Sequence, residues 1–190
     1  MKYGIWQAFK NETWFSRIGA FLSTKYNYLV TEMADTFSYV EPIKAHENVW
    51  SHKYANIIIE SSVVFESTIK EIIVKAKLSY NQDIHGFLKF LKDNDDEIEK
   101  LQLIFINSEG GHKLIPFRRM TKGDPRPRWW DAYTNLKHGH ISNFPEGNLC
   151  NSLNALAAIT IIHHKINMVA GRSGFFINVG IIDNKTPLLF

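Results

Sequence analysis

The feature that most constrains the fold is a long amphipathic repeat over residues 51–78. Its apolar residues recur every three or four positions, which is the spacing of one face of an α-helix. These residues are Tyr54, Ile58, Phe65, Ile69, Ile72 and Ala76. Ser51 is well placed to cap the first turn, because its hydroxyl can accept a bond from a free backbone N–H group. A helix of this length with one apolar face must be covered by other elements, so the sequence predicts packed helices.

Four further segments predict helices that could supply this cover. They span residues 14–37, 84–91, 127–138 and 149–170. Gly139 and Gly171 follow the last two segments, and glycine readily adopts the left-handed conformation that ends a helix. The predicted fold class is therefore mainly α, a bundle of four to five helices.

A small β-hairpin insertion is predicted within residues 101–120. Two short apolar runs flank the turn-forming residues 108–111, and Pro116 confines the second run to a sheet edge. The acidic residues 93–97 predict a turn that faces water. The tail, residues 172–190, is apolar and punctuated by glycine, so we expect strand-like segments that pack on the body or on a second subunit.

Size and composition indicate one folded domain over residues 1–190, with its core in about 50–170. A chain of 190 residues that is 45% hydrophobic can bury a sizeable core. The single Cys150 excludes an intrachain disulfide, and neither a secretory signal nor a membrane-spanning apolar run is visible. We therefore expect a cytoplasmic protein with no membrane association. A net charge of +3 permits an anionic partner but does not require one.

The segment 127–138 carries a polar stripe opposite an aromatic face. At about 100° per residue, four polar side chains fall within an arc of about 80°. The stripe consists of Arg128, Asp131, Asn135 and His138. The opposite side carries Trp129, Tyr133 and Leu136. Such a helix can bury its aromatic residues while it presents a cation, a carboxylate, an amide and an imidazole together.

Two interpretations of the stripe stay open. In the functional one, His138 is a general acid or base near neutral pH, Asp131 or Asn135 orients it, and Arg128 holds a phosphate. In the structural one, Asp131 pairs with Arg128, Asn135 is solvated, and His138 ends the helix near its negative pole.

The string RWWDAYTNLKHGH at residues 128–140 resembles HEPN-like proteins, a helical-bundle family common in bacterial toxin–antitoxin and phage-defence systems. The resemblance extends to the helices predicted at residues 54–72 and 151–162. It implies a HEPN-like bundle that acts as an RNA-directed effector, either by binding RNA or as a metal-independent endoribonuclease. It also implies a homodimer, an antitoxin or other protein partner, and no cofactor.

The resemblance also implies a catalytic set, formed by His138, His140, Asn135 and Lys137. Family members that cut RNA carry an arginine followed, after four to six residues, by a histidine, and here Asn135 occupies that place before His140. Such a cut needs an imidazole for proton transfer and a cation for the developing phosphate charge. Lys137 could supply the cation, but it points away from the stripe. We therefore expect RNA binding more readily than cleavage.

Phosphate contacts are predicted from Arg119, Arg126 and Arg128, because residues 113–137 are locally positive. The alternative is a solvated connecting loop. Glu60 and Glu66 interrupt the apolar repeat and could orient basic groups of the stripe if the two helices pack together.

No metal site is predicted, because the adjacent residues His163 and His164 point to different helix faces. A fold alone does not fix a function. A second function therefore stays open beside the RNA-directed one, namely a non-catalytic helical module for dimerisation or protein interaction.

Overall fold

The computed structural model describes residues 4–105, 112–118, 126–139, 141–169 and 179–182. Six α-helices lie in these ranges: α1 (Gly4–Ala8), α2 (Thr13–Thr36), α3 (His52–Lys75), α4 (Ile84–Asn94), α5 (Arg128–Lys137) and α6 (Leu149–Val169). Three short 3-10 helices join them: η1 (Lys44–His46), η2 (Ile98–Lys100) and η3 (Ile141–Glu146). The prediction of a mainly helical chain is confirmed, and α1 is an addition to it.

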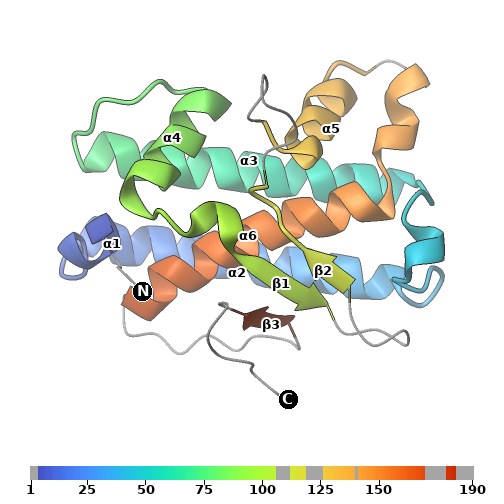
Figure 1. The fold of residues 1–190 in the computed structure, drawn as a ribbon, viewed down its shortest axis with the longest axis horizontal. Coiled ribbons are helices and arrows are strands. Elements are labelled where there is room, and N and C mark those ends of the chain that lie inside the picture. The colour runs from blue at the N-terminus through green and yellow to red at the C-terminus, as the bar shows by residue number, and fades with distance from the viewer. Residues whose placement is uncertain (1–3, 106–111, 119–125, 140, 170–178, 183–190) are drawn as a thin grey trace.

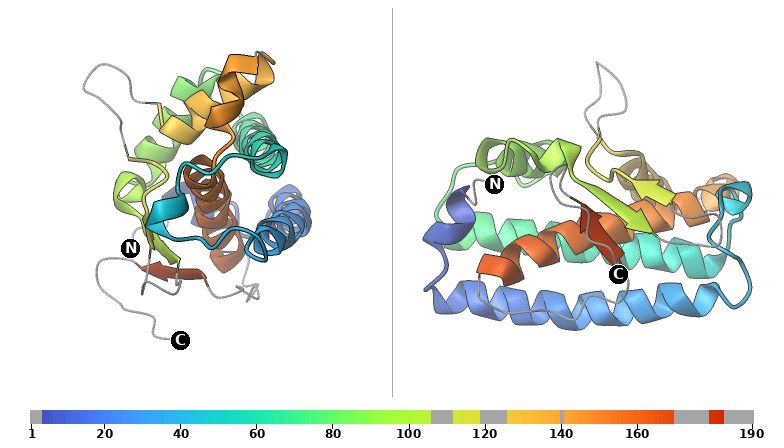
Figure 2. Two further views of the ribbon diagram at one scale, coloured as in Figure 1. Left: turned by 90° about the vertical axis from the view of Figure 1, so that its right-hand side faces the viewer. Right: turned by 60° about the horizontal axis from the view of Figure 1, so that its bottom comes forward.

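The long helices α2, α3 and α6 form the body of the bundle. Helix α6 packs against both α2 and α3, while α4 and α5 lie along α3. Figure 2 shows α2 and α3 side by side and antiparallel on one face of the molecule. The apolar positions that predicted α3 are buried, with Ile58, Phe65, Ile69 and Ile72 fully enclosed, except Ala76, which is half-buried and forms the C-cap. The shared core of these helices thus accounts for the long repeat in the sequence.

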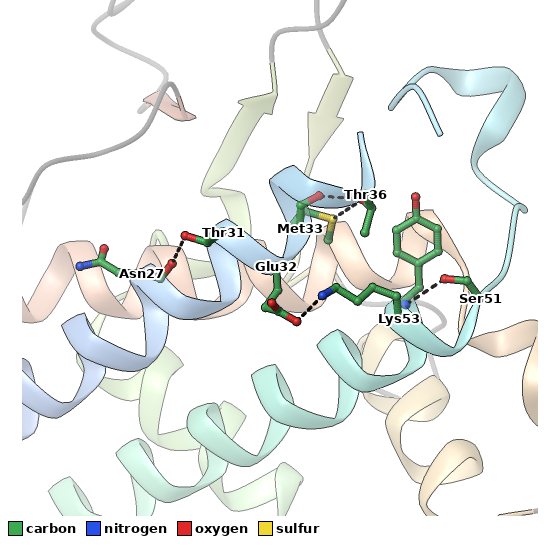
Figure 3. A network of polar contacts seen from close by, with 8 residues as sticks. Asn27, Thr31, Glu32, Met33, Thr36, Ser51 and Lys53 are labelled. Atoms are coloured by element: carbon green, nitrogen blue, oxygen red, sulfur yellow. Dashed lines mark hydrogen bonds and ion pairs between the residues drawn. The ribbon is translucent and has the colours of Figure 1, made fainter. Parts of the chain in front are cut away.

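The predicted cap of α3 is present. The Ser51 hydroxyl accepts a hydrogen bond from the backbone N–H of Tyr54 at 3.1 Å. Figure 3 shows this cap beside an ion pair between Lys53 of α3 and Glu32 of α2. At the end of α2, Thr36 donates a hydrogen bond to the carbonyl of Met33 at 2.6 Å. Of these contacts, the Lys53–Glu32 ion pair joins the start of α3 to α2, and the other two are local to one helix end.

The predicted hairpin is confirmed, and the tail adds a strand to it. Strands β1 (Gln102–Phe105) and β2 (His112–Leu114) pair antiparallel, with Leu103 opposite Leu114. From the tail, β3 (Val179–Ile182) pairs antiparallel with the other edge of β1, giving the order β2-β1-β3. This part of the tail therefore packs on the body of its own chain, and the remainder of residues 172–190 lies outside the described ranges.

The acidic turn at residues 93–97 faces water at Asp93, Asp96 and Glu97, as predicted, but the prediction is wrong for Asp95, which is only 4% exposed. Its carboxylate lies 2.5 Å from the Nζ atom of Lys165 on α6, and both side chains are 2% exposed. The turn between α4 and η2 therefore carries a buried ion pair, because the charge of Lys165 inside the core needs a partner.

Within the described ranges, no helix is both long enough and apolar enough to cross a membrane.

Candidate functional site

Helix α5 is held by its aromatic face, as the sequence predicts. Trp129, Trp130 and Tyr133 are buried, with Trp129 only 1% exposed. The indole of Trp129 meets the ring of Phe65 edge to face at 5.4 Å and donates a hydrogen bond to the Pro116 carbonyl at 2.8 Å. These contacts fasten α5 to α3 and to the segment that follows β2. The polar stripe consequently lies on the side of α5 away from these contacts, and α5 itself lies above α3 in Figure 1.

The stripe residues lie on the outer side of α5. Arg128, Asn135 and His138 are exposed, and Asp131 is half-buried. The carboxylate of Asp131 lies 3.4 Å from the Nε atom of Arg126, which precedes the helix. This ion pair brings a second arginine to the first turn of α5. Both arginines therefore lie at the helix N-terminal end, where the helix dipole by itself already favours anions.

The end of α5 places the imidazole of His138. His138 is the C-terminal cap, and its backbone N–H donates to the Thr134 carbonyl at 3.3 Å. Gly139 follows with a φ of +70°, the left-handed conformation that glycine was predicted to provide. The carbonyl of Asn135 accepts a hydrogen bond from the side chain of Asn143 in η3 at 2.9 Å. Helix η3 therefore supports the last turn of α5.

The predicted catalytic residues do not all share one face. The Nζ atom of Lys137 lies over the ring of Tyr133, 5.5 Å from its centroid, away from the stripe. At about 1.5 Å per residue, Arg128 and His138 stand about 15 Å apart along the helix. The two residues therefore lie at opposite ends of α5 within one copy of the chain. His140 and Arg119 lie outside the described residues.

The acidic residues predicted to orient the stripe come from α3. The Glu60 carboxylate lies 4.0 Å from the Nζ atom of Lys25, on the side of α3 that faces α2. Glu66 is half-buried on α3. Glu60 therefore pairs with α2, and the carboxylate within the stripe is that of Asp131.

A second group of titratable residues lies on α6, inside the bundle. The imidazole of His163 stacks on Tyr26 with 4.5 Å between ring centroids, and its Nε2 atom lies 3.0 Å from the Ser23 hydroxyl. Burial lowers the pKa of His163 to about 4, and the neighbouring His164 contributes. Burial and the charge of Lys165 lower the pKa of His164 to about 4 as well. Both rings are therefore neutral inside the fold at physiological pH.

This burial predicts a loss of stability in mild acid. An unfolded histidine titrates near pH 6.5, so below that pH the unfolded chain binds protons that the folded chain does not. The free energy of unfolding should therefore fall as the pH drops from about 6.5 towards about 4. Thermal melts across this window measure the effect, and His163→Gln should flatten it, with the same substitution at exposed His85 as the control. An equal slope in all three proteins would contradict the assignment.

No group of three or more potential metal ligands occurs among the described residues. Comparison of the chain with models of known protein families, with curated proteins and with solved structures finds no match.

Proposed function

We propose that the protein is an RNA-directed effector with a HEPN-like bundle, acting in a bacterial defence or toxin–antitoxin system. The observation that carries the proposal is the two-sided character of α5. Its aromatic side is buried against α3, while its outer side carries Arg128, Asn135 and His138 in water. Arginine and histidine suit phosphate oxygens, and asparagine suits base edges or sugar hydroxyls.

The spacing of the stripe favours binding over cleavage. Cutting RNA without a metal needs an imidazole and a cation at one phosphate. Along a single α5, Arg126 and Arg128 lie at the first turn and His138 at the last, about 15 Å away. An extended strand that follows the helix could contact both ends through different phosphates. Cleavage would require a second copy of the chain to bring its own residues to the same phosphate, which is the composite arrangement that a HEPN-like homodimer implies.

The proposal predicts that removing either end of the stripe weakens RNA binding. Arg128→Gln should weaken binding to all sequences alike and lower the slope of log affinity against log salt by about 1, because one phosphate contact is lost. His138→Ala should also weaken binding, because it removes an imidazole that can contact a phosphate oxygen. Fluorescence anisotropy with a labelled single-stranded RNA at several salt concentrations measures both quantities, in the presence of a chelator.

Lys70→Gln on the exposed side of α3 is the charge-matched control and should bind as the wild type does. All variants should melt within a few degrees of the wild type, because exposed side chains contribute little to the core. Wild-type protein that neither binds nor cuts RNA would refute the proposal, and so would stripe variants that bind like Lys70→Gln.

A specific observation also favours the non-catalytic interaction module. Large apolar side chains are exposed at the end of the bundle where the α2–α3 connection and η3 lie, notably Tyr39, Trp50 and Ile141. Exposed apolar groups that gather in one region mark contact surfaces on many proteins. Under this second proposal a copy of the chain or an antitoxin covers that end, and the stripe substitutions leave every RNA measurement unchanged.

A further inference from the structure

A groove runs between the first half of α2 and the second half of α3. It encloses about 380 Å³, and its lining includes Trp14, Arg17, Phe21, Thr68, Glu71 and Lys75. The antiparallel pairing of the two helices brings these residues together, as both views in Figure 2 show for α2 and α3. This volume lies within the range of about 300–1,000 Å³ that is typical of small-molecule sites.

The α2 wall of the groove presents two aromatic rings. Trp14 and Phe21 are seven residues apart, so they lie on one helix face two turns from each other. The indole of Trp14 is fixed by Phe15, which meets it edge to face at 5.8 Å, and by Phe9 at 5.0 Å. Phe21, in contrast, is 48% exposed. One held ring and one solvent-exposed ring suit the stacking of a flat aromatic ligand.

The polar groups of the groove favour a ligand that carries an anion. Arg17 lies between the two aromatic residues on α2 and is exposed. On α3, the Nζ atom of Lys75 lies 3.7 Å from the Glu71 carboxylate, so these two charges balance each other. The charge of Arg17 then makes the lining of the groove positive overall. A guanidinium matches the planar fork of phosphate or carboxylate oxygens better than an ammonium does.

We propose that this groove binds a nucleotide unit, an aromatic base stacked on the exposed ring of Phe21 with its phosphate on Arg17. The unit could be a free mononucleotide or one residue of a single-stranded RNA, since both share this chemistry. The inference does not depend on the proposed role of α5, because no α5 residue lines the groove.

Isothermal titration with adenosine monophosphate tests the proposal. Wild-type protein should bind it in a saturable manner, more tightly than adenosine or inorganic phosphate alone, because the base and the phosphate are held by different residues. Phe21→Ala and Arg17→Gln should each weaken binding by about tenfold.

Controls for these changes come from the same helix. Tyr28→Ala removes an exposed aromatic ring of α2, and Lys25→Gln removes a cation, both outside the groove. Both should bind adenosine monophosphate as the wild type does, and so should Arg128→Gln on α5. Titration of a short RNA oligonucleotide into Arg128→Gln distinguishes a free mononucleotide from one residue of an RNA strand as the ligand. Tighter binding of the oligonucleotide than of the mononucleotide identifies RNA.

The proposal is overturned if neither ligand binds, or if inorganic phosphate binds as tightly as the nucleotide. It is also overturned if the groove variants bind like the Tyr28 and Lys25 controls. Stripe variants on α5 that bind RNA as the wild type does, with nucleotide binding intact, would refute the function of the stripe only.

Discussion

Replacing Lys165 by alanine is expected to destabilise the protein by about 3–5 kcal/mol, because it leaves the Asp95 carboxylate buried without its counter-charge. The two charged atoms lie 2.5 Å apart, and each side chain is 2% exposed. Among the described residues, the remaining hydrogen bond to this carboxylate comes from the backbone N–H of Glu97, 3.2 Å from Oδ1. Urea denaturation followed by circular dichroism measures the loss.

A double substitution tests whether the cost arises from the orphaned charge. Lys165→Met combined with Asp95→Leu removes both charges and should recover much of the stability lost in Lys165→Ala, since apolar pairs can replace buried ion pairs at little cost. Lys100→Ala is the exposed control, because Lys100 pairs with Glu97 at 3.0 Å in water. That change should cost less than about 1 kcal/mol. A Lys165→Ala variant as stable as Lys100→Ala would contradict this account.

The same ion pair shows where sequence reasoning ends. The helix periods of α3 and α5 can be read from the sequence because each of these helices buries one face, and that face determines where apolar residues recur, whereas α6 is buried on nearly all sides. Lys165 stands among the buried residues of α6, which indicates that a partner must exist. Its partner comes from a turn 70 residues earlier, and local periodicity contains no information on such a contact. Asp95 therefore resembled its solvated acidic neighbours.

The candidate site divides in the same way. The sequence predicts which residues of α5 form the stripe, because Trp129 and Tyr133 bury one face of the helix and the opposite face must then point to water. The ion pair of Asp131 with Arg126 depends on how the chain enters the helix, which the period of α5 does not determine. Glu60 could be assigned to an exposed edge of α3, but its neighbour Lys25 is fixed by the packing of α2. The groove between α2 and α3 likewise exists only once the two helices are paired.

Trp129→Ala is expected to destabilise the protein by about 3–5 kcal/mol, since it removes a large buried side chain from the centre of an aromatic cluster. The ring of Trp129 contacts Phe65 and Trp130 at centroid distances of 5.4 and 5.6 Å. Its indole N–H also satisfies the Pro116 carbonyl, so truncation both opens a cavity and breaks the link between α5 and the segment after β2. Thermal and urea unfolding monitored by circular dichroism measure the loss.

Two further substitutions separate these contributions. Trp129→Phe keeps an aromatic ring in the cluster but removes the N–H donor, so it should cost less than the alanine change while still losing about 1 kcal/mol for the unmade hydrogen bond. Trp50→Ala removes a tryptophan that is largely exposed and should alter stability far less. If Trp129→Ala unfolds at the same denaturant concentration as Trp50→Ala, the aromatic face does not anchor α5. The outward direction of the stripe would then lose its physical basis, because only the anchored face turns Arg128 and His138 towards water.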